Sequence, residues 1–316
     1  MNILGIETSN LYPSVAISKN GIEIFAKKDY RQNSQAENLI PLIEEALEKT
    51  RLQYSDLDFV AASVGPGSFT GIRIGVAAAR AIAISVPSVK TICVNNFETI
   101  NFRIGQQVTK YDVAISCINA YRGEVYMQFF CKEGTAICHP SLEKIEAAAT
   151  KINVLKGKIA ISGSGINKLF LPNNFGENTP EYIATKNSAE LAALTYLNRN
   201  ALNIPNDHSL SRIDRISSRS IGTEQILQKI PVAKYASSNK SLEDFDPQIL
   251  SALGPEAIHG PQTNGLVILP RFVNPDARIV CRVAREKVLS GLYNQNLDPL
   301  YIREPDAKVN YTNPYK

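Results

Sequence analysis

The sequence predicts an α/β fold built from two copies of one unit. The first half of the chain opens with a buried strand in ILGIETS and two more strands in SVAISKNGIEIFAK. Asn20 and Gly21 lie between the two apolar runs of the second stretch, and this pair is the strongest short hairpin signal because both residues tolerate a positive φ. From about residue 111 the same order begins again, with YDVAISCINA, the turn AYRGE and VYMQFF. A repeated meander followed by helices and strands indicates a duplicated α/β domain rather than one doubly wound sheet.

Two helices continue the first half. The stretch from Ser34 to Glu37 is a capping box, in which both side chains satisfy free backbone donors, so we expect a helix from Ser34 to about Lys49. Pro41 lies inside this helix and predicts a kink. The strand DFVAASV then leads into GPGSFTGIRIG, residues 65–75, and a second, alanine-rich helix.

The glycine segment fits neither common phosphate-binding pattern. The dinucleotide fingerprint fails at Thr70, where a further glycine is required, and the P-loop fails at Ile72, where a lysine must reach the outer phosphates. Gly71, Gly75 and Ala79 instead recur every four residues and share one helix face, so another backbone is expected to approach that face closely. This backbone belongs either to the chain's own sheet or to a helix of another subunit, and the residues alone favour the first alternative.

Composition excludes several classes of protein. The chain has 316 residues and is 44% hydrophobic, as expected for a globular protein with a proper core. It has no apolar run long enough to cross a bilayer and no signal peptide at its start, so we expect a cytoplasmic protein. Five cysteines without a C-x-x-C pair predict reduced, mostly buried thiols. A formal charge of +4 without a strong basic run neither supports nor excludes a nucleic-acid partner.

Metal and nucleophile chemistry have few candidates. The three histidines, His139, His208 and His259, are isolated, so no zinc motif can be assembled, and the glycine segment lacks the spacing of a serine nucleophile elbow. We expect no metal.

A nucleotide site has weaker support, from the end of the first strand. A carboxylate and two hydroxyls there could hold a Mg-nucleotide beside the glycine loop, although capping and turn roles explain the hydroxyls equally well. The candidate nucleotide-proximal residues are Glu7, Thr8, Ser9, Gly67 and Ser68.

Residues 205–297 interrupt the repeated order. They include the serine-rich stretch SLSRIDRISSRS, a short strand in GLVILPRFV and a helix in IVCRVAREKVLSGLY. We therefore expect an N-terminal subdomain at 1–110, a C-terminal subdomain at 111–204 plus 298–316, and an atypical, partly disordered insertion at 205–297.

The sequence resembles the TsaB family, also called YeaZ. The resemblance rests on IETSNLYPSVAI, LIPLI, DLDFVAASVGPGSFTGIRIG, NAYRGEVY, SGSG, SAELAALTYL and PLYIREPDAK, in that order. It implies the duplicated actin-like ATPase fold (ASKHA, ribonuclease H-like) and a role in threonylcarbamoyladenosine modification of tRNA. It also implies a heterodimer with a TsaD-type transferase, work with a TsaE-type ATPase, contact with tRNA through the complex, a homodimer of the chain alone, and ATP or ADP only at the complex interface.

The resemblance further implies a subunit that is not the catalyst. TsaD carries a metal-binding H-M-E-G-H after the strand that corresponds to VKTICV, whereas this chain has NFETI, with Asn96 and Ile100 at the two histidine positions. An isoleucine cannot coordinate a metal.

In the family, the first two helices of the N-terminal half form the subunit contact. On this basis we expect Gly75→Arg to abolish pairing while leaving the fold intact. The residues expected at the interface are Leu39, Ile40, Ile43, Leu47, Gly71, Ile72, Gly75, Ala78, Ala79 and Ile82.

Departures from the family pattern occur at Gln35, Asn119 and Tyr121, where many TsaB sequences have His, Asp and Arg. The residues give three rival functions less support. An independent actin-fold ATPase or kinase-like enzyme would depend on Glu7, Thr8 and the glycine loops. A metalloprotease fails on the missing histidine pair, and a free-standing tRNA-binding module lacks a concentrated basic patch.

Overall fold

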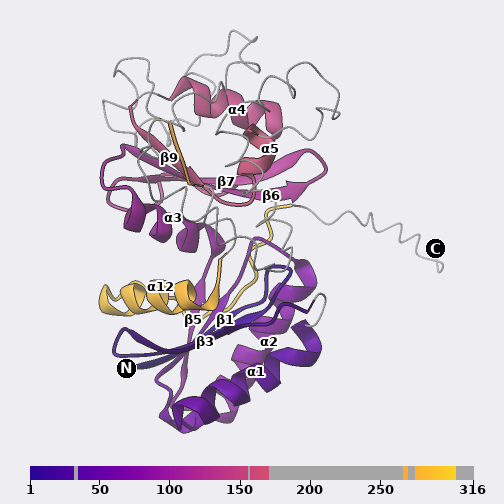
Figure 1. Ribbon diagram of the computed structural model, residues 1–316, viewed down its shortest axis with the longest axis vertical. Coiled ribbons are helices and arrows are strands. Elements are labelled where there is room, and N and C mark those ends of the chain that lie inside the picture. The colour runs from indigo at the N-terminus through magenta and orange to yellow at the C-terminus, as the bar shows by residue number, and fades with distance from the viewer. Residues whose placement is uncertain (32–34, 156, 171–265, 270–274, 304–316) are drawn as a thin grey trace, which may run out of the picture.

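The computed structural model describes residues 1–31, 35–155, 157–170, 266–269 and 275–303. Within this part of the chain, two α/β subdomains stack one above the other (Figure 1). None of the helices described there is long and apolar enough to cross a membrane. The predicted Ser34 cap and the predicted helix NSAELAALTYLN lie outside the described residues.

The N-terminal half contains a five-stranded sheet in the order β3-β2-β1-β4-β5. The first three strands form an antiparallel meander, and β4 and β5 add parallel to β1. In chain order the elements are β1 (Asn2–Glu7), β2 (Ser14–Lys19), β3 (Ile22–Lys28), α1 (Gln35–Thr50), β4 (Phe59–Ser63), α2 (Phe69–Ser85), β5 (Lys90–Val94) and α3 (Asn96–Gln107).

The C-terminal half repeats this plan. Its sheet has the order β10-β9-β6-β7-β8, which is the same order read from the other edge, with a meander followed by two parallel strands. The elements are β6 (Val113–Tyr121), β7 (Glu124–Cys131), β8 (Ser141–Lys144), α4 (Ile145–Val154), β9 (Ile159–Ser162), α5 (Ile166–Phe170), β10 (Leu266–Leu269) and α12 (Ala277–Leu289). The predicted duplication is confirmed, and the fold is the duplicated actin-like ATPase fold.

Each half gives its last helix to the sheet of the other half. Helix α3 follows β5 of the first sheet but packs on the second sheet, where Phe97 and Ile100 meet Ala114 and Phe130. Helix α12 follows β10 of the second sheet but packs on the first. Both helices lie in the middle of the molecule, between the two sheets (Figure 1). The outer faces of the sheets are covered locally, by α1 and α2 on the first sheet and by α4 and α5 on the second.

This exchange corrects the predicted division of the chain. The described parts of 205–297 are not an insertion outside both repeats, because β10 pairs with β9 and α12 covers the first sheet. Likewise α3, expected in the N-terminal subdomain, packs on the C-terminal sheet. Helix α12 and the first sheet lie near opposite ends of the sequence, which hides their contact, whereas α3 directly precedes β6, the strand on which it packs.

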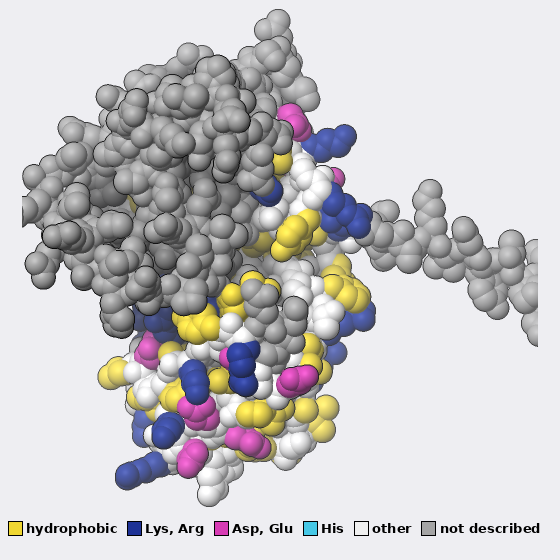
Figure 2. All heavy atoms as spheres, turned by 45° about the vertical axis from the view of Figure 1, so that its right-hand side comes forward, with side chains coloured by type: hydrophobic (Ala, Val, Ile, Leu, Met, Phe, Trp, Pro, Cys, Tyr) yellow, Lys and Arg dark blue, Asp and Glu magenta, His cyan; other side chains and the backbone are white. Residues whose placement is uncertain are grey.

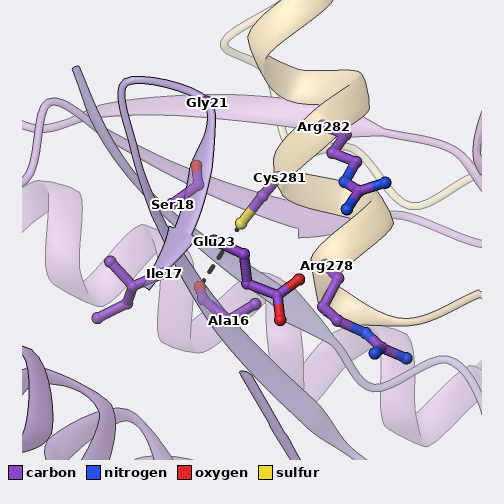
Figure 3. A pocket seen from close by; sticks show the side chains of 8 residues that line it. All are labelled: Ala16, Ile17, Ser18, Gly21, Glu23, Arg278, Cys281 and Arg282. Carbon is purple, nitrogen blue, oxygen red and sulfur yellow. Dashed lines mark hydrogen bonds between the residues drawn. The ribbon is translucent and has the colours of Figure 1, made fainter. Parts of the chain in front are cut away.

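Cys281 of α12 lies over Gly5 and Ala16, where the first sheet has only small residues. The Cys281 thiol donates to the carbonyl oxygens of Ile3 and Ala16, each at 3.6 Å, and burial raises the pKa of this thiol to about 12. A pocket of about 10 Å³ remains between α12 and the β2–β3 hairpin, as Figure 3 shows. It is large enough for one water molecule at most.

Gly5 permits this close packing, and its substitution tests the helix exchange. A Cβ at Gly5 would lie 2.6 Å from both the Ala277 carbonyl oxygen and the Cys281 sulfur. We expect Gly5→Ala to lower the free energy of unfolding by about 1–3 kcal/mol, because α12 must move away from β1. Urea unfolding measures the change. In the matched control, Gly105→Ala in α3, the nearest atom would be 3.6 Å away, so no loss is expected. Equal stability of wild type and Gly5→Ala would contradict this packing.

Candidate functional site

Polar residues gather at the carboxyl end of β1, the edge where open α/β sheets commonly bind ligands. Glu7, Thr8 and Ser9 are all buried, with exposed fractions of 0%, 1% and 3%. The glycine loop before α2 and the first residue of α3 lie against them. The structure therefore brings together the residues predicted to be near a nucleotide.

The Glu7 carboxylate is only half satisfied. Its Oε1 accepts hydrogen bonds from the Ser9 amide at 2.6 Å, the Ser9 hydroxyl at 2.5 Å and the Asn10 side chain at 3.2 Å. Its Oε2 is buried without a hydrogen-bond partner. Burial therefore raises the pKa of Glu7 from its ordinary 4.5 to about 7, although the serine hydrogen bonds act in the opposite direction.

Asn96 joins this carboxylate to the neighbouring elements. The Ser63 hydroxyl donates to Asn96 Oδ1 at 2.6 Å. Asn96 Nδ2 donates to the Ser9 hydroxyl at 2.6 Å and to the Pro66 carbonyl at 2.8 Å. Both polar atoms of the Asn96 side chain therefore form hydrogen bonds, and these connect the ends of β1 and β4 with the glycine loop.

The end of β1 packs against the glycine stripe of α2, which is the helix face formed by Gly71, Gly75 and Ala79. A Cβ at Gly71 would lie 2.0 Å from the Thr8 carbonyl oxygen, and one at Gly75 would lie 2.3 Å from Thr8 Oγ1. The Thr8 hydroxyl donates to the Gly71 carbonyl at 2.7 Å, and the Ser68 amide donates to the Ser9 carbonyl at 2.7 Å. Of the two alternatives for the approaching backbone, the chain's own sheet is the one observed. Gly75→Arg would therefore disrupt the fold, contrary to the expectation that it would affect pairing alone.

The nucleotide candidates form a closed network rather than an open cradle. The polar atoms of Thr8 and Ser9 are used in hydrogen bonds within the chain, and those of Glu7 are enclosed. Only Gly67 and Ser68 are exposed. A nucleotide contact at these five residues stays a prediction. In the observed arrangement their hydrogen bonds hold the end of β1 against the glycine loop.

Most of the residues predicted to bind a partner face the interior of the chain. Nine of the ten are buried in the chain's own core or against β1, and only Ile40 is exposed. Their burial follows from their apolar character, because apolar periodicity marks the helix face that covers the sheet. The nine buried residues are Leu39, Ile43, Leu47, Gly71, Ile72, Gly75, Ala78, Ala79 and Ile82.

The opposite face of α1 and α2 is exposed and partly apolar. Phe69 and Ile84 of α2 have exposed fractions of 53% and 80%, and Ile40 of α1 has 45%. On the side of the molecule in Figure 2, hydrophobic side chains are interspersed with both signs of charge. The sequence carries a signal for this face, since α2 is apolar nearly all round. We define the docking face by twelve of the exposed residues of these helices, which are Ala36, Glu37, Ile40, Pro41, Glu44 and Glu48 of α1, and Phe69, Arg73, Ala77, Arg80, Ala81 and Ile84 of α2.

The three departures from the family pattern have local contacts. Gln35 Nε2 donates to the carbonyls of Asn10 and Leu11, which ties α1 to the β1–β2 loop. Asn119 Oδ1 accepts from the Tyr121 amide at 2.9 Å. Tyr121 has a positive φ of 61° at the β6–β7 turn, a conformation that glycine and asparagine usually supply.

The buried carboxylate predicts an unusual pH dependence. Because the folded state holds the Glu7 proton more tightly than the unfolded state, it carries more protons between pH 4.5 and about 7. The free energy of unfolding therefore falls as pH rises through this window, by about 3 kcal/mol in all. We expect Glu7→Gln to remove this fall and to be more stable than wild type at pH 8, as measured by urea unfolding at pH 5 to 8. Glu48→Gln, in which an exposed carboxylate is lost, is the control. A parallel pH profile for Glu7→Gln and wild type would contradict the prediction.

Comparison with known proteins identifies the family. The family model for TsaD, tRNA N6-adenosine threonylcarbamoyltransferase, matches residues 30–200. The TsaB protein of Buchnera aphidicola from Schizaphis graminum is 28% identical over 171 residues, which cover 53% of this chain and 80% of that protein. A tRNA N6-adenosine threonylcarbamoyltransferase of Bacillus anthracis is 33% identical, but over only 99 residues that cover 26% of this chain and 29% of that protein.

A solved structure, YeaZ from Pseudomonas aeruginosa, matches with a TM-score of 0.47 at 20% identity over 53% of this chain and 78% of that one. The sequence match to TsaB extends over most of the relative, whereas the match to the transferase stops at less than a third. The chain therefore belongs to the TsaD family and, within it, to the TsaB proteins.

Proposed function

We propose that this chain is a non-catalytic subunit that pairs with a TsaD-type transferase in tRNA threonylcarbamoyladenosine biosynthesis. The names of its relatives support involvement in that pathway. The observation that carries the pairing is the exposed, partly apolar docking face of α1 and α2. The reaction takes place on tRNA, so we expect the complex to act in the cytoplasm.

The docking face suits a related partner. The TsaD family model spans α1 and α2, so a TsaD-type transferase carries equivalent helices. Two related chains can pair about an approximate two-fold axis, with α1 of each facing α2 of the other. On this face α1 exposes Glu37, Glu44 and Glu48, whereas α2 exposes Arg73 and Arg80. The arrangement brings acidic and basic side chains opposite each other, which favours correct orientation. The same complementarity allows a homodimer when the chain is alone.

Two buried residues support a non-catalytic role. Asn96 and Ile100 stand where TsaD is expected to carry its metal-binding histidines. The Asn96 amide is engaged with Ser63, Ser9 and Pro66, and Ile100 is packed among apolar side chains of the second sheet. Neither side chain is available to a substrate.

We expect a nucleotide, a TsaE-type ATPase and tRNA to bind to the complex of this chain with the transferase, and not to this chain alone. The polar network around Glu7 is closed, so we expect ATP or ADP to contact this chain only where Gly67 and Ser68 are exposed beside the docking face. The rival function, an independent actin-fold ATPase or kinase-like enzyme, would require stoichiometric ATP binding by the isolated chain.

Substitution of Ile84 tests the docking face. We expect Ile84→Arg to weaken pairing with the transferase by at least about 100-fold, because a charge would be buried among apolar side chains. Its 80% exposure predicts an unchanged fold. Size-exclusion chromatography with light scattering on the two chains and their mixture measures the complex.

Ile22→Arg is the matched control, because Ile22 is 69% exposed but lies on the edge strand β3. Wild type and Ile22→Arg should form a one-to-one complex, and Ile84→Arg should not. A full complex with Ile84→Arg would overturn the docking face, and no complex with wild type would overturn the proposed pairing.

A further inference from the structure

Two aromatic rings and one guanidinium group form a stacked cluster at one end of the docking face. The rings of Phe69 and Tyr301 lie with their centroids 5.3 Å apart and are tilted by 37°. The guanidinium carbon of Arg73 lies 3.8 Å from the Phe69 ring centroid, and Arg73 Nε donates to the Tyr301 hydroxyl at 3.1 Å. Phe69 and Tyr301 are both about half exposed. We call these three residues the aromatic cluster.

Tyr301 reaches α2 on a chain segment that returns from α12. This return segment, residues 294–303, lies beside β5, where the Asn294 carbonyl accepts from the Cys93 amide at 2.9 Å. Leu297 is buried in the core beneath α2, and the Leu300 amide donates to the Val64 carbonyl at 2.8 Å. Backbone hydrogen bonds at Asn294 and Leu300 thus hold the return segment in place, and the second lies directly before Tyr301.

A second contact fixes the return segment to the exposed side of α2. Arg80 Nη2 donates to the Leu297 carbonyl and to Asp298 Oδ1, each at 3.1 Å. Arg73 and Arg80 lie two helical turns apart, so α2 is bound to the return segment at two points. The aromatic cluster is therefore ordered before any partner arrives.

We propose that the aromatic cluster is an anchor point for the transferase, and that it receives an acidic, amphipathic helix of that partner. This inference rests on the proposed function. Exposed aromatic and arginine side chains that are already ordered are the usual composition of an interface hot spot, since little side-chain entropy is lost on binding. An apolar side chain of the partner would cover the rings, and a carboxylate would bind Arg73.

The chemistry of Arg73 points to an acidic partner. Its Nε is used by Tyr301, and it forms no ion pair within the described part of the chain. Its terminal nitrogens can therefore donate two parallel hydrogen bonds to a carboxylate. The chain's own α1 shows the matching pattern, because exposed Ile40 is flanked by Glu37 and Glu44 on the same helix face. An equivalent helix is expected in the transferase, since the TsaD family model spans this helix.

A protein partner fits the surroundings better than an RNA base. Bases also stack on aromatic rings beside arginine, but such sites continue into a basic groove that follows the phosphates. Here α2 continues from the cluster into Ala77, Ala81 and Ile84. The one further arginine on this stretch of α2, Arg80, is already paired with Asp298, so the cluster does not continue into a free basic groove.

The test compares Tyr301→Ala with Tyr301→Phe and a distant control. Isothermal titration calorimetry of the full chain with the full transferase should show a dissociation constant about 10-fold higher or more for Tyr301→Ala. Tyr301→Phe keeps the ring and should stay within about 3-fold of wild type, because packing rather than the hydroxyl supplies most of the contact. Leu292→Ala, at an exposed apolar residue beyond α12, should bind like wild type.

The outcomes separate this inference from the proposed function. If Ile84→Arg blocks pairing while Tyr301→Ala binds like wild type, the docking face stands and the anchor is overturned. If neither change weakens pairing, both fail. Loss of tRNA binding by the isolated Tyr301→Ala chain, with pairing intact, would also overturn the anchor and favour base stacking. Thermal melting confirms that each variant is folded.

Discussion

Each sheet of this molecule has two apolar faces, and the chain covers the inner face of each with a helix from the other half. Sheets buried on both sides need helices on both sides. The N-terminal sheet receives α12, whose residues Val280 and Ala284 pack against Ile3 and Ala16. The C-terminal sheet receives α3. Neither half can complete its core alone, so the two subdomains form one cooperative unit.

This exchange brings the end of the chain back to the docking face. Because α12 must lie on the first sheet, the residues after it leave from that sheet and run beside β5. Arg303 then forms an ion pair with Glu124 of the second sheet. The return segment consequently contacts both subdomains, and a partner seated on Tyr301 would also fix how the two subdomains lie relative to each other.

Local patterns in the sequence predict much of this fold. The hairpin at Asn20 and Gly21, both meanders and the helices α1, α2 and α12 all follow from short-range signals. The exchange of α3 and α12 does not, because an amphipathic helix shows that it must be covered but not by which sheet. The glycine stripe shows the same limit. Its close approach to a backbone is predicted correctly, whereas the identity of that backbone, at Thr8, depends on a contact across 63 positions.

The candidate site divides in the same way. Glu7, Thr8, Ser9, Gly67 and Ser68 do gather in space, since carboxyl ends of neighbouring parallel strands meet at one edge. Whether such a gathering is open or closed depends on the side chains that fill it. Here Asn96, which the sequence marks only as a missing histidine, closes the site by bonding Ser9, Ser63 and Pro66.

The closed hydrogen-bond network around Glu7 lies beneath the docking face and helps to position it. The Ser9 carbonyl binds the amide of Ser68, the residue immediately before α2, and Asn96 begins α3. The same few hydrogen bonds therefore fix where α2 begins, and so where Phe69 presents its ring, and where the exchanged helix α3 leaves the first sheet. A half-satisfied carboxylate in that position costs stability. In return, the hydrogen-bond network around Glu7 fixes the positions of α2 and α3. One buried cluster therefore sets both the docking face and the packing of the two subdomains on each other.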